Sequence, residues 1–325
     1  MAQLATVFGG SGFIGSQIVR ALARDGWRIR VAVRRPERAY RLRPMGDVGQ
    51  IEIVQANLRD RDSAARALDG SQAAVNAVGV LFESGRQRFS PIHVEGAATI
   101  AREARAAGTR SLVHLSAIGA DASSPSRYAR TKAEGESAVR AAFAAASILR
   151  PSVVFGPEDD FFNRFAGLAA IAPALPLIGG GATRFQPVFV GDVAEAAARL
   201  LANPRDEGRT FELGGPRIYS FRDLMVLVLA ETGRRRILIP IPVPVAKALG
   251  SAGDLLAAFG LTPPITTDQV KLLGRDNVVA ENVLGLSDLG LAPTAVEGII
   301  PTYLWRYRKG GQYSTTNPAA AEVGF

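Results

Sequence analysis

The chain has 325 residues, of which 47% are hydrophobic and 21% charged, a composition typical of a globular protein with a substantial core. It contains no cysteine and only two histidines, which excludes disulfides, thiolate metal sites and cysteine nucleophiles, and we predict no metal site. The formal net charge is +8, and only four of the 38 basic residues are lysines, so the surface offers mainly arginine to anionic partners.

Three further classes of protein are not expected. No uncharged apolar run approaches the ~20 residues that span a bilayer. The first predicted strand begins at Leu4, which leaves no room for a signal or transit peptide, so we expect the chain to work in a bacterial cytoplasm. No nucleic-acid-binding module is recognisable, and we expect no nucleic-acid partner.

Short apolar runs alternate with amphipathic, alanine-rich stretches through the first half of the chain. This alternation predicts an α/β fold with a doubly wound parallel Rossmann sheet, whose ligand crevice lies at the carboxyl ends of the strands. The predicted helices cover residues 12–24, 62–68, 95–107 and 128–145. The predicted strands cover residues 4–8, 29–33, 51–55, 74–77, 111–115 and 147–154.

The first strand runs directly into a glycine-rich turn, in which Gly9, Gly12 and Gly15 have the spacing G-x-x-G-x-x-G. Glycine permits the tight turn and lets a pyrophosphate approach the amides at the start of the next helix, including those of Phe13 and Ile14. Because strand, turn and helix follow in this order, the segment predicts a dinucleotide-binding loop.

The second predicted strand ends in Arg34 and Arg35, where NAD-binding sheets usually carry an acidic residue for the ribose 2′-hydroxyl. An arginine at this point can form forked, charge-assisted hydrogen bonds with a 2′-phosphate. We therefore predict NADP(H) as the cofactor. The alternative is that these arginines are merely solvated and that the protein binds NAD(H).

Short polar residues and a glycine also mark the ends of the third and fourth strands. Asn57 and Leu58 close the third strand, and Asn76 and Gly79 lie at the end of the fourth, where adenine and ribose would bind. We predict that these four residues line the nucleotide site, although residues of these types also serve as turn formers.

Tyr128 and Lys132 are four residues apart on a predicted helix and therefore share one face. An ammonium group beside a tyrosine favours the phenolate, which makes the tyrosine a usable general acid or base, and the lysine can bind the nicotinamide ribose. With the glycine-rich loop, this pair makes the chain resemble an extended, atypical short-chain dehydrogenase/reductase. The resemblance implies catalytic roles for Tyr128 and Lys132, with Ser116 after the fifth strand as a candidate to bind the substrate oxygen.

The sequence departs from that family at two positions. Ile118 stands where a serine or threonine usually binds the substrate oxygen, so Ser116 could take this role only if the loop shifts. His93 stands where a structural asparagine is usual, and we expect both His93 and His114 to be structural or surface histidines. Both departures argue against turnover.

The pattern changes after Gly156, where proline, glycine and phenylalanine become frequent. We expect a Rossmann domain over residues 1–155, completed by a strand near 210–214, and a smaller C-terminal α/β lobe over most of 156–308. Residues 309–325 contain few large apolar side chains and are expected to form a flexible tail.

Three segments resemble the NADPH-binding accessory subunits of respiratory complex I and their bacterial relatives. They cover residues 149–169, 185–196 and 268–279, and their most specific part is FGPEDDFFNRF. The resemblance implies a subunit that packs on other complex I subunits, peripheral to the cytoplasmic face of the inner membrane, and holds NADPH without independent turnover. Two alternatives stay open: an NADP-dependent reductase or epimerase of a small carbonyl compound that uses Tyr128 and Lys132, and an NADP(H)-sensing regulator.

Two segments are candidates for contact with an anionic lipid surface. Tyr303, Trp305 and Tyr307 lie among cations, which suits a headgroup interface or an acidic partner. The alternative is that the aromatic side chains are core and the cations are solvated. Residues 245–261 have apolar side chains at helical spacing, and we expect them to form core of the smaller lobe rather than a membrane or partner contact.

Overall fold

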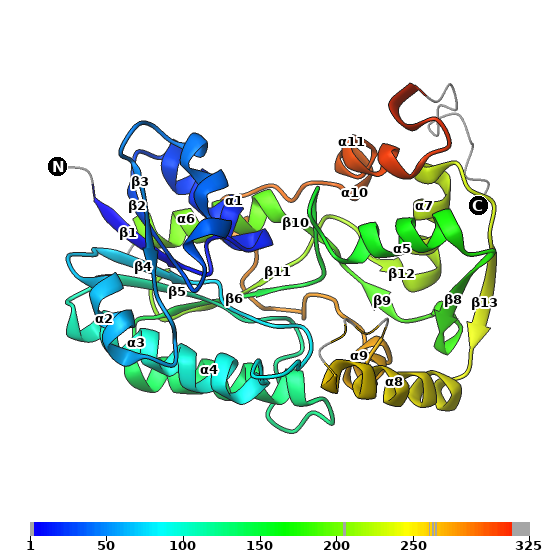
Figure 1. The fold of residues 1–325 in the computed structure, drawn as a ribbon, viewed down its shortest axis with the longest axis horizontal. Helices are drawn as coiled ribbons and strands as arrows, with labels where there is room; N and C mark the ends of the chain where they lie inside the picture. Colours follow the sequence, from blue (N-terminus) through cyan, green and yellow to red (C-terminus); the bar gives the residue numbers. More distant parts are fainter. Residues whose placement is uncertain (1–2, 204–205, 260, 262, 264, 314–325) are drawn as a thin grey trace.

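The computed structural model is built around a seven-stranded parallel sheet in the order β11-β6-β5-β4-β1-β2-β3 (Figure 1). This confirms the predicted doubly wound α/β architecture, including the return of a late strand to the sheet edge. The structure describes residues 3–203, 206–259, 261, 263 and 265–313. The strands of the sheet are β1 (Leu4–Phe8), β2 (Arg28–Val33), β3 (Ile51–Gln55), β4 (Ala73–Asn76), β5 (Ser111–Leu115), β6 (Ser147–Pro151) and β11 (Thr210–Leu213).

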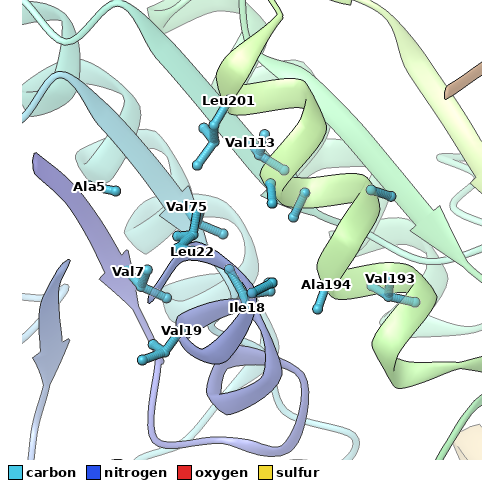
Figure 2. Close-up of a cluster of buried hydrophobic side chains, with 14 of the residues drawn as sticks. Ala5, Val7, Ile18, Val19, Leu22, Val75, Val113, Val193, Ala194 and Leu201 are labelled. Atoms are coloured by element: carbon cyan, nitrogen blue, oxygen red, sulfur yellow. The ribbon is translucent and has the colours of Figure 1, made fainter. Parts of the chain in front are cut away.

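Helices cover both faces of this sheet. On one face Ile18, Leu22 and Val193 of two helices meet Val7 and Val75 of the strands in one buried cluster (Figure 2). These helices are α1 (Phe13–Arg24) and α6 (Val190–Ala202). The opposite face is covered by α2 (Arg61–Leu68), α3 (Ala97–Ala106) and α4 (Arg127–Ala142), and a π-helix over Ser90–Gly96 precedes α3.

The predicted strand over residues 147–154 is wrong as a single element. β6 ends at Pro151, and the separate strand β7 (Val154–Phe155) pairs with β10 (Val188–Phe189). The cause is Asn277, whose side-chain oxygen accepts hydrogen bonds from the Ser152 hydroxyl at 2.6 Å and the Val153 amide at 3.0 Å. These bonds accompany the departure of the chain from the sheet after Pro151, three residues before the predicted end.

The smaller lobe has an aromatic core of its own, in which Phe155, Phe162 and Phe221 are fully buried. Its strands are β8 (Ala174–Ile178), paired with β13 (Ile237–Ile241), and β9 (Arg184–Phe185), paired with β12 (Tyr219–Ser220). Its helices are α5 (Phe161–Ile171), α7 (Phe221–Thr232), α8 (Val243–Ala258), α9 (Thr267–Leu273), α10 (Val296–Ile299) and α11 (Pro301–Leu304). The expected tail lies outside the described residues from position 314 onward.

The segment FGPEDDFFNRF is tied to the end of the folded chain by a buried carboxylate. Asp159 accepts hydrogen bonds from the Gly156 amide at 3.1 Å, the Asn163 amide at 3.1 Å and the Tyr303 hydroxyl at 2.5 Å. Tyr303 is only 4% exposed, which favours the core interpretation of this aromatic segment over a headgroup interface. Burial raises the pKa of Asp159, although the three donors oppose that effect.

The expectation that residues 245–261 form core is wrong for their large side chains. Leu249, Leu255 and Phe259 of this segment are all exposed, whereas its buried residues are small alanines and glycines. The physical reason is the packing of α8, which contacts the lobe through the side of the helix that carries alanine and glycine. Within the described part of the chain, no helix is long and apolar enough to cross a membrane.

Candidate nucleotide site

The turn between β1 and α1 lies at the carboxyl edge of the sheet and needs glycine at two positions. Gly9 has a φ of +76°, and a Cβ there would lie 2.9 Å from the carbonyl oxygen of Ala77. A Cβ on Gly15 would clash with the carbonyl oxygen of Gly9. A side chain at Gly9 would therefore collide with the segment after β4, and one at Gly15 would push α1 away from the turn.

The start of α1 offers amide groups without a competing side chain. Its N-cap is Gly12, which supplies no capping hydrogen bond, and its first turn contains no acidic residue. The amides of Phe13, Ile14 and Gly15 therefore carry the positive end of the helix dipole unopposed. A helix start of this kind is suited to a pyrophosphate group.

The segment after β2 carries several arginines, and one of them contacts this turn. Arg34 and Arg35 directly follow the strand and are exposed, and Arg34 Nη2 donates to Gln87 Oε1 at 3.1 Å. Arg41, on the 3-10 helix η2 (Tyr40–Met45), donates to the carbonyl oxygen of Ser11 within the turn at 3.3 Å. Sequence reasoning missed Arg41, because only the fold of η2 brings it back to the turn.

Two of the residues predicted after β3 and β4 use their amide groups locally. Asn57 Oδ1 accepts from the Arg59 amide at 3.2 Å, as in a turn. Asn76 Oδ1 accepts from the Val78 amide at 3.1 Å, so its Nδ2 is the atom that lies 3.0 Å from His114 Nδ1. The turn-forming alternative therefore applies to both asparagines.

The other two residues of that set lie close to neighbouring segments. Leu58 lies against Gly96, where a Cβ would approach the leucine side chain to 3.1 Å. A Cβ on Gly79 would lie 3.5 Å from Lys132 Nζ, so the glycine leaves open space beside the ammonium group. The structure thus brings Gly79 and Lys132 together, as the sequence predicts for one site.

Tyr128 and Lys132 lie together near the start of α4, with Lys132 Nζ 5.9 Å from the centroid of the tyrosine ring. The buried Nζ donates to the carbonyl oxygen of Leu115, at the end of β5, at 3.0 Å. Burial lowers the pKa of Lys132 to about 8, and Glu136 opposes the shift. Desolvation raises the pKa of Tyr128 to about 12, so at neutral pH the phenol is a hydrogen-bond donor rather than a base.

His93 is a buried residue whose ring packs edge to face with the ring of Tyr128. The Val80 amide donates to His93 Nε2 at 3.2 Å, so the ring proton is on Nδ1, which donates to Thr131 Oγ1 at 3.1 Å. The Thr131 hydroxyl in turn donates to the carbonyl oxygen of Tyr128 at 3.1 Å. Burial and the nearby Lys132 lower the pKa of His93 to about 3. This chain of bonds ties the loop after β4 to the helix that carries Tyr128.

Two buried polar atoms next to this network have no hydrogen-bond partner among the described residues, namely His114 Nε2 and Ser116 Oγ. Because Asn76 donates to Nδ1 of His114, the proton of the neutral ring is on Nε2. Burial lowers the pKa of His114 to about 3, with smaller effects from Lys132 and His93. A buried donor without an acceptor costs about 1–3 kcal/mol, so a water or ligand atom there would be stabilising.

The start of α4 is held by a residue that sequence reasoning did not assign to the site. Asp268, on α9 of the smaller lobe, accepts hydrogen bonds from the Ser126 hydroxyl at 2.7 Å, the Arg127 amide at 2.7 Å and the Tyr128 amide at 3.0 Å. About 140 residues separate these partners in sequence, and no local pattern signals such a contact. Asp268 therefore fixes the helix end from which Tyr128 projects.

The chain is similar to a family of NAD-dependent enzymes, to subunits of the mitochondrial NADH dehydrogenase and to a reductase. The model of the NAD dependent epimerase/dehydratase family matches residues 5–214. A relative from Arabidopsis thaliana, the mitochondrial NADH dehydrogenase (ubiquinone) 1 alpha subcomplex subunit 9, is 35% identical over 95% of this chain and 79% of its own. A ceramide reductase from Caulobacter vibrioides is 32% identical over 81% of each chain.

The fold itself also occurs in solved structures. The Citrobacter sp. triphenylmethane reductase complexed with NADP(H) has a TM-score of 0.69 at 20% identity, covering 90% of this chain and 97% of that one. At this identity the similarity concerns the fold alone. Together the family model and the relatives confirm the resemblance to atypical short-chain dehydrogenases/reductases and to complex I accessory subunits.

The two histidines predict a loss of stability in acid. Their pKa is about 3 in the folded chain and about 6.5 in an unfolded one. Between these values the unfolded state binds more protons, so the free energy of unfolding falls as the pH falls. We expect a slope of about 2 kcal/mol per pH unit between about pH 6 and pH 5, measured by chemical denaturation. His114→Asn should roughly halve that slope, and an unchanged slope would assign it to other groups.

Removal of the Asp268 carboxylate is expected to loosen the start of α4. Asp268→Ala should lower the free energy of unfolding by about 1–2 kcal/mol through loss of a helix cap. Amide hydrogen exchange over Arg127–Lys132 should accelerate in the same variant. The matched control is Asp223→Ala, which removes the capping carboxylate of α7 inside the smaller lobe. Equal acceleration in both variants would contradict a specific role for Asp268.

Proposed function

The chain belongs to the NAD dependent epimerase/dehydratase family, and we propose that it is an NADP(H)-binding accessory or assembly subunit of respiratory complex I, the NADH:quinone oxidoreductase. In this role the nucleotide mainly stabilises the subunit. The name of the Arabidopsis relative supports the assignment to complex I, since the two chains share 35% identity over 95% of this one. We further infer that the protein lies peripherally at the cytoplasmic face of a bacterial inner membrane.

The observation that carries the nucleotide proposal is the uncapped, acid-free start of α1, which follows a turn bonded to the end of β2 through Gly9 and Ala32, two residues before Arg34. Glycine at positions 9, 12 and 15 places no side chain in front of the helix amides, which supports binding of a pyrophosphate there. Arg34 and Arg35 stand where a 2′-phosphate would bind, which supports NADP(H) over NAD(H). Tyr128 and Lys132 would donate hydrogen bonds to the nicotinamide ribose. When bound, NADP(H) can supply a hydride.

Several features support retention of the nucleotide over turnover. The raised pKa of Tyr128, about 12, disfavours the phenolate, which argues against turnover in the direction in which the tyrosine abstracts a proton. Ser116 Oγ is buried, and Ile118 supplies no polar atom where the family binds a substrate oxygen. A ligand that binds only the folded state stabilises it by about 4 kcal/mol at a thousandfold excess over its dissociation constant. A stabilising role for the nucleotide therefore accounts for a site that can bind the cofactor but lacks the usual polar residue for a substrate oxygen.

The proposal predicts that nucleotide survives purification. Protein purified without added nucleotide and then denatured should release near-stoichiometric NADP(H), identified and quantified by chromatography. Arg34→Ala should lose most of the bound NADP(H), because the 2′-phosphate loses a charged partner. The control is Arg28→Ala, at the opposite end of β2, which should retain it. Release of NAD(H), or of no nucleotide from the unaltered protein, would refute the proposal.

A second candidate function is an NADP-dependent reductase, favoured by the similarity to a ceramide reductase and by the pairing of Tyr128 with Lys132. In that case Tyr128→Phe should lower the rate on a carbonyl substrate by about two to four orders of magnitude. Nucleotide content should stay unchanged in the same variant. An unchanged rate on an accepted substrate would exclude tyrosine as the proton donor.

A further inference from the structure

The smaller lobe exposes a concentration of large apolar side chains on β13, at the right of Figure 1, and along α8, which runs along the lower side of the lobe. Among the described residues, nine of the eighteen exposed large hydrophobic side chains fall between positions 237 and 261. Single exposed apolar residues are ordinary on protein surfaces, whereas a contiguous group marks a site of interaction. This group comes from β13 and α8.

The orientation of α8 explains the exposure. Its buried stripe consists of Ala246, Gly250, Gly253 and Ala257, at helical spacing. A Cβ on Gly250 would lie 2.8 Å from the backbone of Thr267, and one on Gly253 would overlap the backbone of the segment before α9. Only the smallest residues of the helix therefore fit against the lobe, and its large residues must face outward.

The outward stripe of α8 is continuous and apolar. Val245, Leu249, Leu256 and Phe259 share one face of the helix and are 51%, 50%, 40% and 78% exposed. A third stripe carries the polar residues Lys247, Ser251 and Asp254. A helix with one apolar and one charged stripe, neither of them buried in the protein, has the character of a helix that lies in a membrane interface.

β13 extends the apolar surface and resists pairing with another strand. Ile237 and Ile239 are 70% and 47% exposed, and among the described strands β13 pairs only with β8. Pro240 lies within the strand, and Pro242 and Pro244 follow it. Because proline has no amide hydrogen, the free edge is poorly suited to strand addition by a protein partner.

The charge around this surface is positive. Residues 233–258 contain four basic residues and one acidic residue, Asp254, and the exposed cations Arg235 and Lys247 are among them. The exposed apolar side chains are mainly aliphatic and include no tryptophan or tyrosine, residue types that dominate the energetics of protein–protein interfaces. Aliphatic residues flanked by cations match the acyl chains and headgroups of an anionic bilayer.

We propose that the α8–β13 face docks on the surface of a bilayer with anionic headgroups. The face is defined by Ile237, Ile239, Val245, Leu249, Leu256 and Phe259. The axis of α8 lies parallel to the membrane plane, and its apolar stripe enters the boundary between headgroups and acyl chains. The proposal extends the proposed function, but it requires neither bound nucleotide nor another subunit.

The test is flotation of the purified full-length protein with vesicles of phosphatidylcholine that contain about one quarter phosphatidylglycerol. The protein should float with these vesicles, bind pure phosphatidylcholine more weakly, and dissociate as salt is added. The triple variant Leu249→Gln/Leu256→Gln/Phe259→Ser should lower the partition coefficient more than about tenfold. A matched control, Val48→Gln/Ile218→Gln/Val283→Gln, removes exposed apolar side chains elsewhere and should bind as the unaltered protein does.

Failure of the unaltered protein to bind anionic vesicles at low salt would overturn the proposal, as would equal losses in the two triple variants. A third outcome would also overturn the proposal. If the unaltered protein binds no vesicles but captures complex I subunits, and the first triple variant does not capture them, the face contacts protein rather than lipid. Nucleotide release from the same samples reports separately on the proposed function. An intact nucleotide content with no vesicle binding would refute the docking face alone.

Discussion

The carboxylate of Asp268 joins the two halves of the molecule at the start of α4. Three donors converge on it, and two of them are helix amides that would otherwise lack a partner. Tyr128 and Lys132 project from the first two turns of this helix, so their position relative to the glycine turn depends on the smaller lobe as much as on the sheet. α9, which supplies the carboxylate, is in turn packed against the small stripe of α8.

The rest of α4 is fixed to the sheet by charged and polar contacts. Arg150 on β6 makes hydrogen bonds of 2.9 and 2.7 Å to Glu136 of α4 and lies 3.5 Å from Glu212 of β11. Both carboxylates are buried, so loss of the arginine would leave them uncompensated. Asp268 therefore holds the start of α4, Arg150 holds its middle, and His93 bonds to Thr131 of its first turns. Such a site is preorganised, which reduces the entropy lost when a ligand binds.

The sequence predicts what local patterns encode. The glycine spacing and the alternation of apolar runs predict the β1–α1 turn and the parallel sheet, because each depends on residues close together in the chain. Asn277, Arg41 and Asp268 act on segments more than twenty residues away, and no periodicity signals such contacts. Helical spacing also predicted the apolar stripe of α8 but not its direction, because only the packing of Gly250 and its neighbours decides which side faces the lobe.

The position of β11 in the sequence affects how the protein folds during translation. Its neighbour in the sheet, β6, ends at Pro151, whereas β11 begins at Thr210, and part of the smaller lobe lies between them. At a synthesis rate of about 5–20 residues per second, β6 emerges several seconds before the strand that covers its edge. An uncovered parallel edge is a template for pairing with other chains. Changes in β11 are therefore expected to affect the yield of folded protein during translation as well as the stability of the finished molecule.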